Sequence, residues 1–569
     1  SYNVAIGSSA GSQVTTGTNN TIIGGLAGDA LTTGSQNVAL GYAALSAEDT
    51  GGRNVAIGYF SLVNQNYDGN AYNTAVGHAS GQNVTTGIGN SILGGAAADA
   101  LTTGSFNVAI GAFSLSVEDT GNKSIAIGYA ALENQNNDDD NYNVAVGHNA
   151  GKMISTGTQN VIVGGLAGDA LTTGSANVAI GYQALSSEDG HGRNVAIGKS
   201  ALLNQNAGDE AYNVAVGYHS GLSVTTGFQN TFIGGLAGDA LTTGAQNVAI
   251  GYLALTAANG NENYNVAVGT GSLMNLDGSG DMWNTAVGTN SGLSLTTGTL
   301  NVLIGGRAGD ALTTGSNNVA VGFDALGAED GHGGNVAVGY RALKVQNAGA
   351  TAYNVAIGRD AGLSVSTGTL NTLIGAFAGD ALTTGARNVV LGYQALSSED
   401  TGTDATAIGY RALKNQDANS TFNTAVGKDA GLSLTSASQC VFVGAVAGDA
   451  ITTGVNNTAI GCSALGAEDA GQGNTAVGTN ALITQDGGDN NTAVGLSAGA
   501  DITTGDNNTL IGQNAGHSGS NNLTTGSNNI IIGKDAAASA ADVSNEITLG
   551  NSSISAIRAQ VTSISSLSD

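Results

Sequence analysis

The sequence predicts an all-β protein, a parallel β-roll or β-solenoid of about 32 short coils. Three observations lead to this fold class. The phrase Asn-Val-Ala-Ile-Gly and its close variants recur 32 times, usually 17 residues apart. The same Gly closes every copy, and Pro is absent from all 569 residues. A short fixed period of this kind is typical of stacked units that share one continuous core.

We number each coil from its Asn, so that the recurring Gly is position 5. Positions 2 to 4 predict a short strand, because β-branched residues recur there with a period of two. Gly at position 5 predicts a bend, so a Val in place of Gly181 should disturb the stacking. Phrases such as Thr32-Thr33-Gly34 predict a second short strand and a second corner. The Asn side chains should hydrogen-bond from coil to coil, as they do in stacked strands.

A longer rhythm lies over the short one. Four coils make a block of about 70 residues, and eight such blocks cover residues 1–550. We interpret 1–550 as one repetitive shaft and 551–569 as a separate C-terminal segment. The third coil of most blocks carries a Glu-Asp pair, as at Glu48 and Asp49.

The strands are expected to be apolar on both faces. Positions 2 and 4 share one face and position 3, usually Ala, takes the other. A strand that is apolar on both faces should be covered on both faces. One face can fill the coil, and sister chains must then cover the other. The sequence therefore predicts an intimate homotrimer that forms a long rod, with three chains around one axis.

The composition excludes several classes of partner. A net charge of −27, with only 15 Lys and Arg, argues against binding of nucleic acid, because phosphate contacts need basic side chains. No apolar run approaches the roughly 20 residues of a membrane span. The two cysteines, Cys440 and Cys462, occupy different positions of their coils and are interpreted as isolated small core residues. Their redox state stays open.

The repeat phrase, followed shortly by a small residue, resembles two related families. These are the left-handed parallel β-roll heads of trimeric autotransporter adhesins and the repeat shafts of phage tail fibres. The 17-residue coil is longer than the adhesin coil. In addition, residues 545–569 resemble the segment before the self-cleaving intramolecular chaperone of endosialidase-type tail fibres and spikes.

This resemblance implies a left-handed homotrimer outside the cell, as part of a virion. It also implies that a chaperone has cut itself off next to Ser568, so that Ser568 and Asp569 mark a maturation cleavage junction. The chain opens at Ser1 in the middle of the rhythm. We therefore expect it to be a piece of something longer, with other virion tail proteins on its N-terminal side.

Aromatic residues precede the first Asn of seven blocks. Two interpretations are open for them: a packing plug in the enlarged turn, which we favour, and a repeated platform for stacking host glycans. Tyr residues at position 6, such as Tyr42 and Tyr59, are interpreted in the same way. The possible glycan contacts are Tyr2, Tyr72, Tyr142, Tyr212, Trp283, Tyr353 and Phe422.

The sequence indicates no catalytic group and no confident metal site. The six His residues show no His-x-x-x-His spacing and are interpreted as solvated repeat positions. Structural cations such as calcium remain a weak alternative to solvated carboxylates at trimer clefts. The weak candidates are equivalent Asp residues of the second coils: Asp29, Asp169, Asp239, Asp310, Asp380 and Asp449.

These observations favour a non-catalytic structural and adhesive fibre of a phage virion. Its rigid trimeric shaft would present contacts to a host cell-surface receptor, either a glycan or a protein. One alternative is a bacterial trimeric adhesin head, which should continue into a coiled-coil stalk, although residues 551–569 show no heptads. A second alternative is a polysaccharide-degrading tailspike, which needs paired carboxylates in a groove.

Overall fold

The computed structural model describes residues 2–418 and 422–558. The described residues form 32 strands and no helix, which confirms the all-β parallel solenoid with its 17-residue period. The expected cleavage junction at Ser568 and Asp569 lies outside the described residues. The chain divides into two compact units, Ser1–Leu300 and Asn301–Asp569, and each is described by itself. The boundary expected at residue 550 stays a prediction, and residues 551–558 contain no strand.

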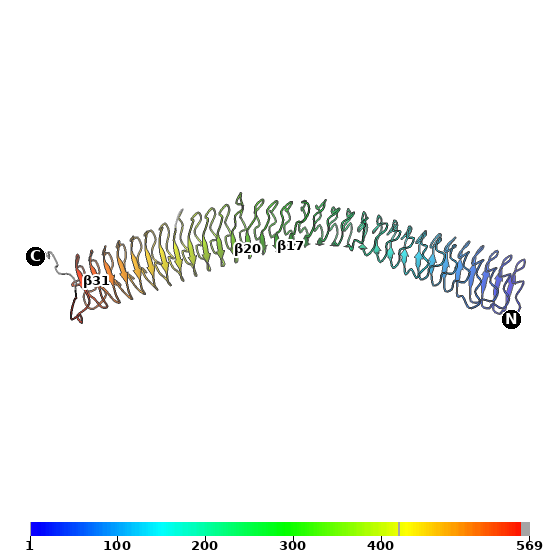
Figure 1. The fold of residues 1–569 in the computed structure, drawn as a ribbon, viewed down its shortest axis with the longest axis horizontal. Helices are drawn as coiled ribbons and strands as arrows, with labels where there is room; N and C mark the ends of the chain where they lie inside the picture. The colour runs from blue at the N-terminus through cyan, green and yellow to red at the C-terminus, as the bar shows by residue number, and fades with distance from the viewer. Residues whose placement is uncertain (1, 419–421, 559–569) are drawn as a thin grey trace. The chain divides into compact units, whose positions relative to one another are not determined.

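In the first unit each coil contributes one three-residue strand, which pairs in parallel with the strand of the next coil (Figure 1). Equivalent positions face each other, as Val38 faces Val55 and Leu40 faces Ile57. The strands are β1(Val4–Ile6), β2(Thr21–Ile23), β3(Val38–Leu40), β4(Val55–Ile57), β5(Thr74–Val76), β6(Ser91–Leu93), β7(Val108–Ile110), β8(Ile125–Ile127), β9(Val144–Val146), β10(Val161–Val163), β11(Val178–Ile180), β12(Val195–Ile197), β13(Val214–Val216), β14(Thr231–Ile233), β15(Val248–Ile250), β16(Val266–Val268) and β17(Thr285–Val287).

The second unit repeats this arrangement, again with parallel pairing between consecutive coils (Figure 1). Its strands are β18(Val302–Ile304), β19(Val319–Val321), β20(Val336–Val338), β21(Val355–Ile357), β22(Thr372–Ile374), β23(Val389–Leu391), β24(Thr406–Ile408), β25(Thr424–Val426), β26(Val441–Val443), β27(Thr458–Ile460), β28(Thr475–Val477), β29(Thr492–Val494), β30(Thr509–Ile511), β31(Ile530–Ile532) and β32(Ile547–Leu549).

Position 3 faces the inside of the coil. Ala39 and Ala56 at this position are buried, as are the small side chain at position 8 (Ala44) and the larger one at position 12 (Leu31). These three positions meet inside the coil. The core is built mainly from Ala and Leu, one layer per coil, with a larger residue at position 3 in second coils, as at Phe232.

The Asn residues at position 1 link each coil to the next. The side-chain Oδ1 of Asn37 accepts the backbone N–H of Asn54 at 2.9 Å, and its Nδ2 donates to the carbonyl of Gly51 in its own coil at 2.9 Å. The expected ladder is confirmed, but its recurring links join side chain to backbone. Asn37 thereby satisfies two backbone groups that the turn leaves without a strand partner, whereas the Nδ2 atoms of Asn54, Asn194 and Asn335 donate no hydrogen bond.

The Gly at position 5 adopts a backbone conformation that other residues avoid. Gly181 has φ of 135°, and a Cβ at this residue would lie 2.5 Å from the carbonyl oxygen of Gly198 in the next coil. Successive coils therefore approach through these glycines, which confirms the expected bend.

The second strand expected at Thr-Thr-Gly is wrong. Thr32 and Thr33 lie in a bend, and both of their N–H groups donate to the same carbonyl, that of Asp49, at 2.7 and 3.3 Å. The Thr32 hydroxyl donates to that carbonyl as well, at 3.1 Å. Since one acceptor takes all three donors, no regular ladder can form on this side of the coil.

Candidate functional site

The outward face of the sheet is apolar and uncovered in each unit. Positions 2 and 4 point outward, so Leu40 is 42% exposed while Ala39 beside it is 1% exposed. Position 4 is aliphatic in every coil, whereas position 2 is Thr or Ser in several of them, as at Thr21 and Thr74. A recurring row of partly exposed aliphatic side chains is typical of an interaction surface. The exposed members in the first unit are Val4, Ile6, Leu40, Leu93, Ile125, Val161 and Ile233. Those in the second unit are Ile304, Ile357, Val389, Leu391, Val443, Ile460, Val494, Ile511, Ile530, Ile532, Ile547 and Leu549.

The aromatic residues that precede each block are exposed. Tyr72 is 55% exposed, Tyr142 50% and Trp283 52%, which does not fit the favoured interpretation as a packing plug. Each stacks on the equivalent residue of the preceding coil: the Arg53 guanidinium carbon lies 5.2 Å from the ring centre of Tyr72, and Tyr264 stacks on Trp283 at 4.0 Å. Tyr2, Tyr212, Tyr353 and Phe422 are exposed to a similar or greater extent. These rings therefore present flat, accessible faces.

A second aromatic row lies at position 6. Tyr42 stacks on Tyr59 at 5.5 Å, and Tyr59 stacks on His78 at 5.3 Å. One block later, His148 stacks on Tyr129 in the same way, at 5.3 Å. His78 and His148 are thus members of exposed ring stacks, in agreement with their interpretation as surface repeat positions.

The Asp residues of the second coils stand apart from one another. Burial raises the pKa of Asp169 and Asp449 above the ordinary range and that of Asp380 to about 6. The nearest partners of Asp239 and Asp310 are the Thr256 hydroxyl and the Arg307 guanidinium. Among the described residues none of Asp29, Asp169, Asp239, Asp310, Asp380 and Asp449 joins two other potential metal ligands.

In most blocks position 12 carries polar side chains inside two of the four coils, whereas the block that begins at Asn213 has only apolar residues there. Glu118 of the third coil is fully buried, and the amide of Gln135 in the fourth coil donates to its Oε2 at 3.0 Å. Equivalent bonds join Gln416 to Glu399 and Gln485 to Glu468. These Glu-Gln pairs form polar layers between apolar ones.

Burial dominates the electrostatics of these layers. It raises the pKa of Glu48 to about 7, because the cost of desolvating the carboxylate exceeds the effect of the N–H groups of Gly51 and Tyr67 that donate to it. The pKa of Glu118 is raised for the same reason. These carboxyl groups therefore titrate above the pH at which an exposed Glu loses its proton.

In two third coils, the loop after the buried Glu contains a His. Glu188, Asp189 and His191 of the first unit form one group of potential metal ligands, and their ligand atoms lie within 4.8 Å of one another. Glu329, Asp330 and His332 form an equivalent group in the second unit.

A surface hollow lies beside each of these loops. The hollow of the first unit has a volume of about 350 Å³ and is lined by Thr173, Ser175, His191 and Glu210, among others. That of the second unit has about 410 Å³ and is lined by Thr314, Ser316, His332 and Tyr353, among others.

These ligand groups were missed by reasoning from spacing. Spacing between His residues does not reveal the pattern Glu-x-x-His, although the phrase Glu-Asp-Gly-His-Gly occurs twice, each time in a third coil. The repeat itself would have indicated that this Glu occupies the interior position of the coil.

The cysteines differ in their surroundings. Cys440 is buried and takes the place of the Asn at position 1, and burial raises the pKa of its thiol to about 11. Cys462 is exposed at position 6, so its interpretation as a core residue is wrong. Both thiols are free in the structure.

Comparison with models of known protein families found no match, and comparison with curated proteins also found none. Among the described residues no helix is long and apolar enough to cross a membrane.

Proposed function

We propose that this chain is a non-catalytic structural and adhesive protein, the shaft of a phage tail fibre on an extracellular virion, in which three identical chains, each a left-handed solenoid, pack together. The observation that carries the proposal is the uncovered aliphatic face along β1–β17 and along β18–β32. A chain that exposes such a face in coil after coil is stabilised when a sister chain covers it, since apolar surface is then removed from water.

Self-association explains the composition of this face better than binding of an unrelated protein does. Its rows repeat with the period of the coil, so a second copy of the chain presents the same spacing. A coil of 17 residues also encloses little apolar volume by itself. Packing between chains would supply the part of the core that a single coil lacks.

The aromatic row before each block supports the adhesive part of the proposal. Exposed Tyr and Trp rings are suited to stacking on sugars, because they combine a flat apolar face with a polar edge. Seven copies in each of three chains would turn weak single contacts into strong attachment to a host glycan or receptor.

The mass of the native particle tests the assembly. We expect about three times the 55.5 kDa of one chain by sedimentation or native mass spectrometry. A monomer would contradict the proposal.

Thiol labelling tests which face is covered. In a Cys462→Ser background, Leu391→Cys reports on the outward face and Val345→Cys on a surface outside the strands. The two side chains are equally exposed in a single chain, at 44% and 46%, so they form a matched pair. We expect slow maleimide labelling at residue 391 and fast labelling at residue 345, and equal rates would refute the proposed interface.

A further inference from the structure

Six third coils carry a buried Glu at position 12, and the residue three positions later divides them into two classes. It is Gly in four loops, Gly51, Gly121, Gly402 and Gly471, and His in two. We propose that the two His loops, 188–191 and 329–332, each bind one divalent transition-metal ion of the Zn²⁺ type, with Glu, Asp and His as ligands.

The distances between the ligand atoms suit a small ion. Two atoms that are each about 2.1 Å from a tetrahedral Zn²⁺ lie roughly 3.4 Å apart. The Nδ1 atom of His191 lies 3.7 Å from Oε1 of Glu188, and the corresponding atoms of His332 and Glu329 lie 3.3 Å apart. The neighbouring Asp carboxylate supplies a third ligand, which leaves the fourth position to water.

The buried atoms of these loops have no other partner. Glu188 is fully buried, yet its Oε2 accepts no hydrogen bond, and the buried Nδ1 of His191 also has none. In the second unit Oε2 of Glu329 likewise accepts no hydrogen bond, and Nδ1 of His332 has only the ion-pair contact with Oε1 of Glu329. Unsatisfied buried polar atoms are costly, and one metal ion bound in each loop would give these atoms a partner.

The His side chain changes the position of the carboxylate. In the Gly loops the carboxylate occupies the space of the missing side chain: a Cβ at Gly402 would lie 2.4 Å from Cδ of Glu399. A His in this place displaces the carboxylate, and the bond from the backbone N–H lengthens from 2.6 Å at Gly402 to 3.1 Å at His191. The Oε1 atom of the displaced Glu188 then lies 3.7 Å from the imidazole Nδ1.

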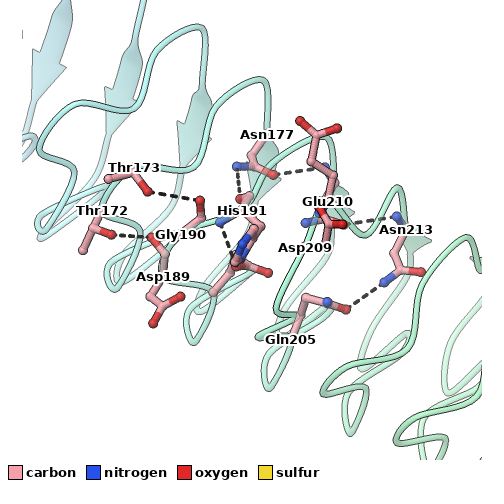
Figure 2. Close-up of polar contacts among 12 residues, drawn as sticks. Thr172, Thr173, Asn177, Asp189, Gly190, His191, Gln205, Asp209, Glu210 and Asn213 are labelled. Carbon is pink, nitrogen blue, oxygen red and sulfur yellow. Dashed lines mark hydrogen bonds and ion pairs between the residues drawn. The ribbon is translucent and has the colours of Figure 1, made fainter.

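The preceding coil and the Asn of the same coil hold the loop in position (Figure 2). The Thr172 hydroxyl donates to the carbonyl of Asp189 at 2.6 Å, and the Thr173 hydroxyl donates to that of Gly190 at 3.1 Å. Asn177 donates to the carbonyl of His191 at 3.2 Å. Three consecutive carbonyls are thus anchored, so the ligands are ordered before the ion binds, at little cost in entropy.

The donor set selects the kind of metal. One imidazole nitrogen with two carboxylates suits Zn²⁺ and its first-row neighbours, whereas Ca²⁺ requires six to eight oxygen ligands. The group Glu399, Asp400 and Asp417 provides oxygen ligands only, so it serves as an internal comparison and not as a second site of the same kind.

Zinc stoichiometry of the full-length chain tests the proposal. We expect two Zn²⁺ per chain by isothermal titration with zinc chloride, one in His191→Gly or His332→Gly, and none in the double variant. Gly is a safe replacement, because the chain itself uses it at this place in four other loops. The control His148→Gln, in an exposed ring stack, should leave both ions bound.

A second measurement separates binding from folding. Zinc should raise the melting temperature of the wild type and leave that of the double variant unchanged, while both show the same circular dichroism without zinc. Absence of zinc binding at micromolar concentration in the wild type would overturn the proposal. Equal stoichiometry in the wild type and the double variant would overturn it as well.

Discussion

The Gly at position 5 allows a sharp test of how the coils stack, because Gly94 and Gly95 are adjacent and differ in surroundings. A Cβ at Gly94 would lie 2.6 Å from both C and O of Gly111, and the residue has φ of 147°. A Cβ at Gly95 would meet nothing within 4 Å, and its φ lies outside the left-handed region. Gly94→Val and Gly95→Val therefore form a matched pair.

The expected cost of Gly94→Val follows from these distances. Ordinary contact between carbon and oxygen needs about 3.5 Å, so the next coil must move away by roughly 0.9 Å. That movement would stretch the bond from the N–H of Gly111 to the carbonyl of Leu93, now 2.7 Å, beyond the hydrogen-bonding limit. Backbone strain, overpacking and the lost bond together destabilise by roughly 4 kcal/mol.

Hydrogen exchange locates the damage, and thermal unfolding measures its size. In a repeat array the cost falls on the interface between neighbouring coils, so amide protection should fall near residues 91–111 and persist in distant coils. Gly95→Val should match the wild type within about 0.5 kcal/mol. Equal protection and equal melting temperatures for the two variants would refute the role assigned to position 5.

Three other predictions concern the interior and the aromatic row. The free energy of unfolding should fall as the pH rises from about 4.5 to 7, because the folded state keeps Glu48 protonated while the unfolded chain releases the proton. Glu48→Gln should reduce this pH-dependent loss by roughly 3 kcal/mol over the interval. An unchanged pH dependence in urea titrations would contradict this prediction. Asn107→Ala should destabilise by roughly 2–4 kcal/mol, since it leaves two buried backbone groups unpaired, whereas the exposed Asn83→Ala should be nearly neutral in the same denaturation assay. Tyr142→Ala should weaken binding to host-cell glycans on an array without changing the melting temperature, and retained binding after all seven aromatic substitutions would exclude the row as the contact surface.

The repeat predicts the strands because every coil shows the same residue pattern. Positions 2 to 4 and the Gly that follows carry the β-branched and turn-forming residues that local structure requires, and the strands lie at these positions. Which face turns inward was not predictable from hydrophobicity, since Ala39 and Leu40 are both apolar. The structure shows that position 3 is buried whether it holds Ala39 or the much larger Phe232, whereas Ile233 at position 4 is 39% exposed.

The candidate metal loops were not predictable from spacing alone, because their ligand geometry depends on a buried Glu. In sequence, Glu188 resembles one half of a solvated acidic pair. Only its place at position 12, inside the coil, makes it a buried carboxylate with an unpaired oxygen. The prediction of a strand at the Thr-Thr segment was wrong for a related reason. The Thr hydroxyls compete with backbone groups for one carbonyl, and β-propensity does not include that competition.

The 70-residue block solves a problem that near-identical coils create. Strands with the same sequence can pair with the wrong neighbour, because every alternative register buries the same Ala row. Position 12 removes this degeneracy: in the second block it holds Val84, Leu101, Glu118 and Gln135 in successive coils, all buried. If the chain skipped the fourth coil, Glu118 would lie against the apolar Ile154 of the next block and lose its amide partner. Such a misfold costs the desolvation of an unpaired carboxyl group, so the buried polar layers favour the correct order of coils even though they add little to its stability.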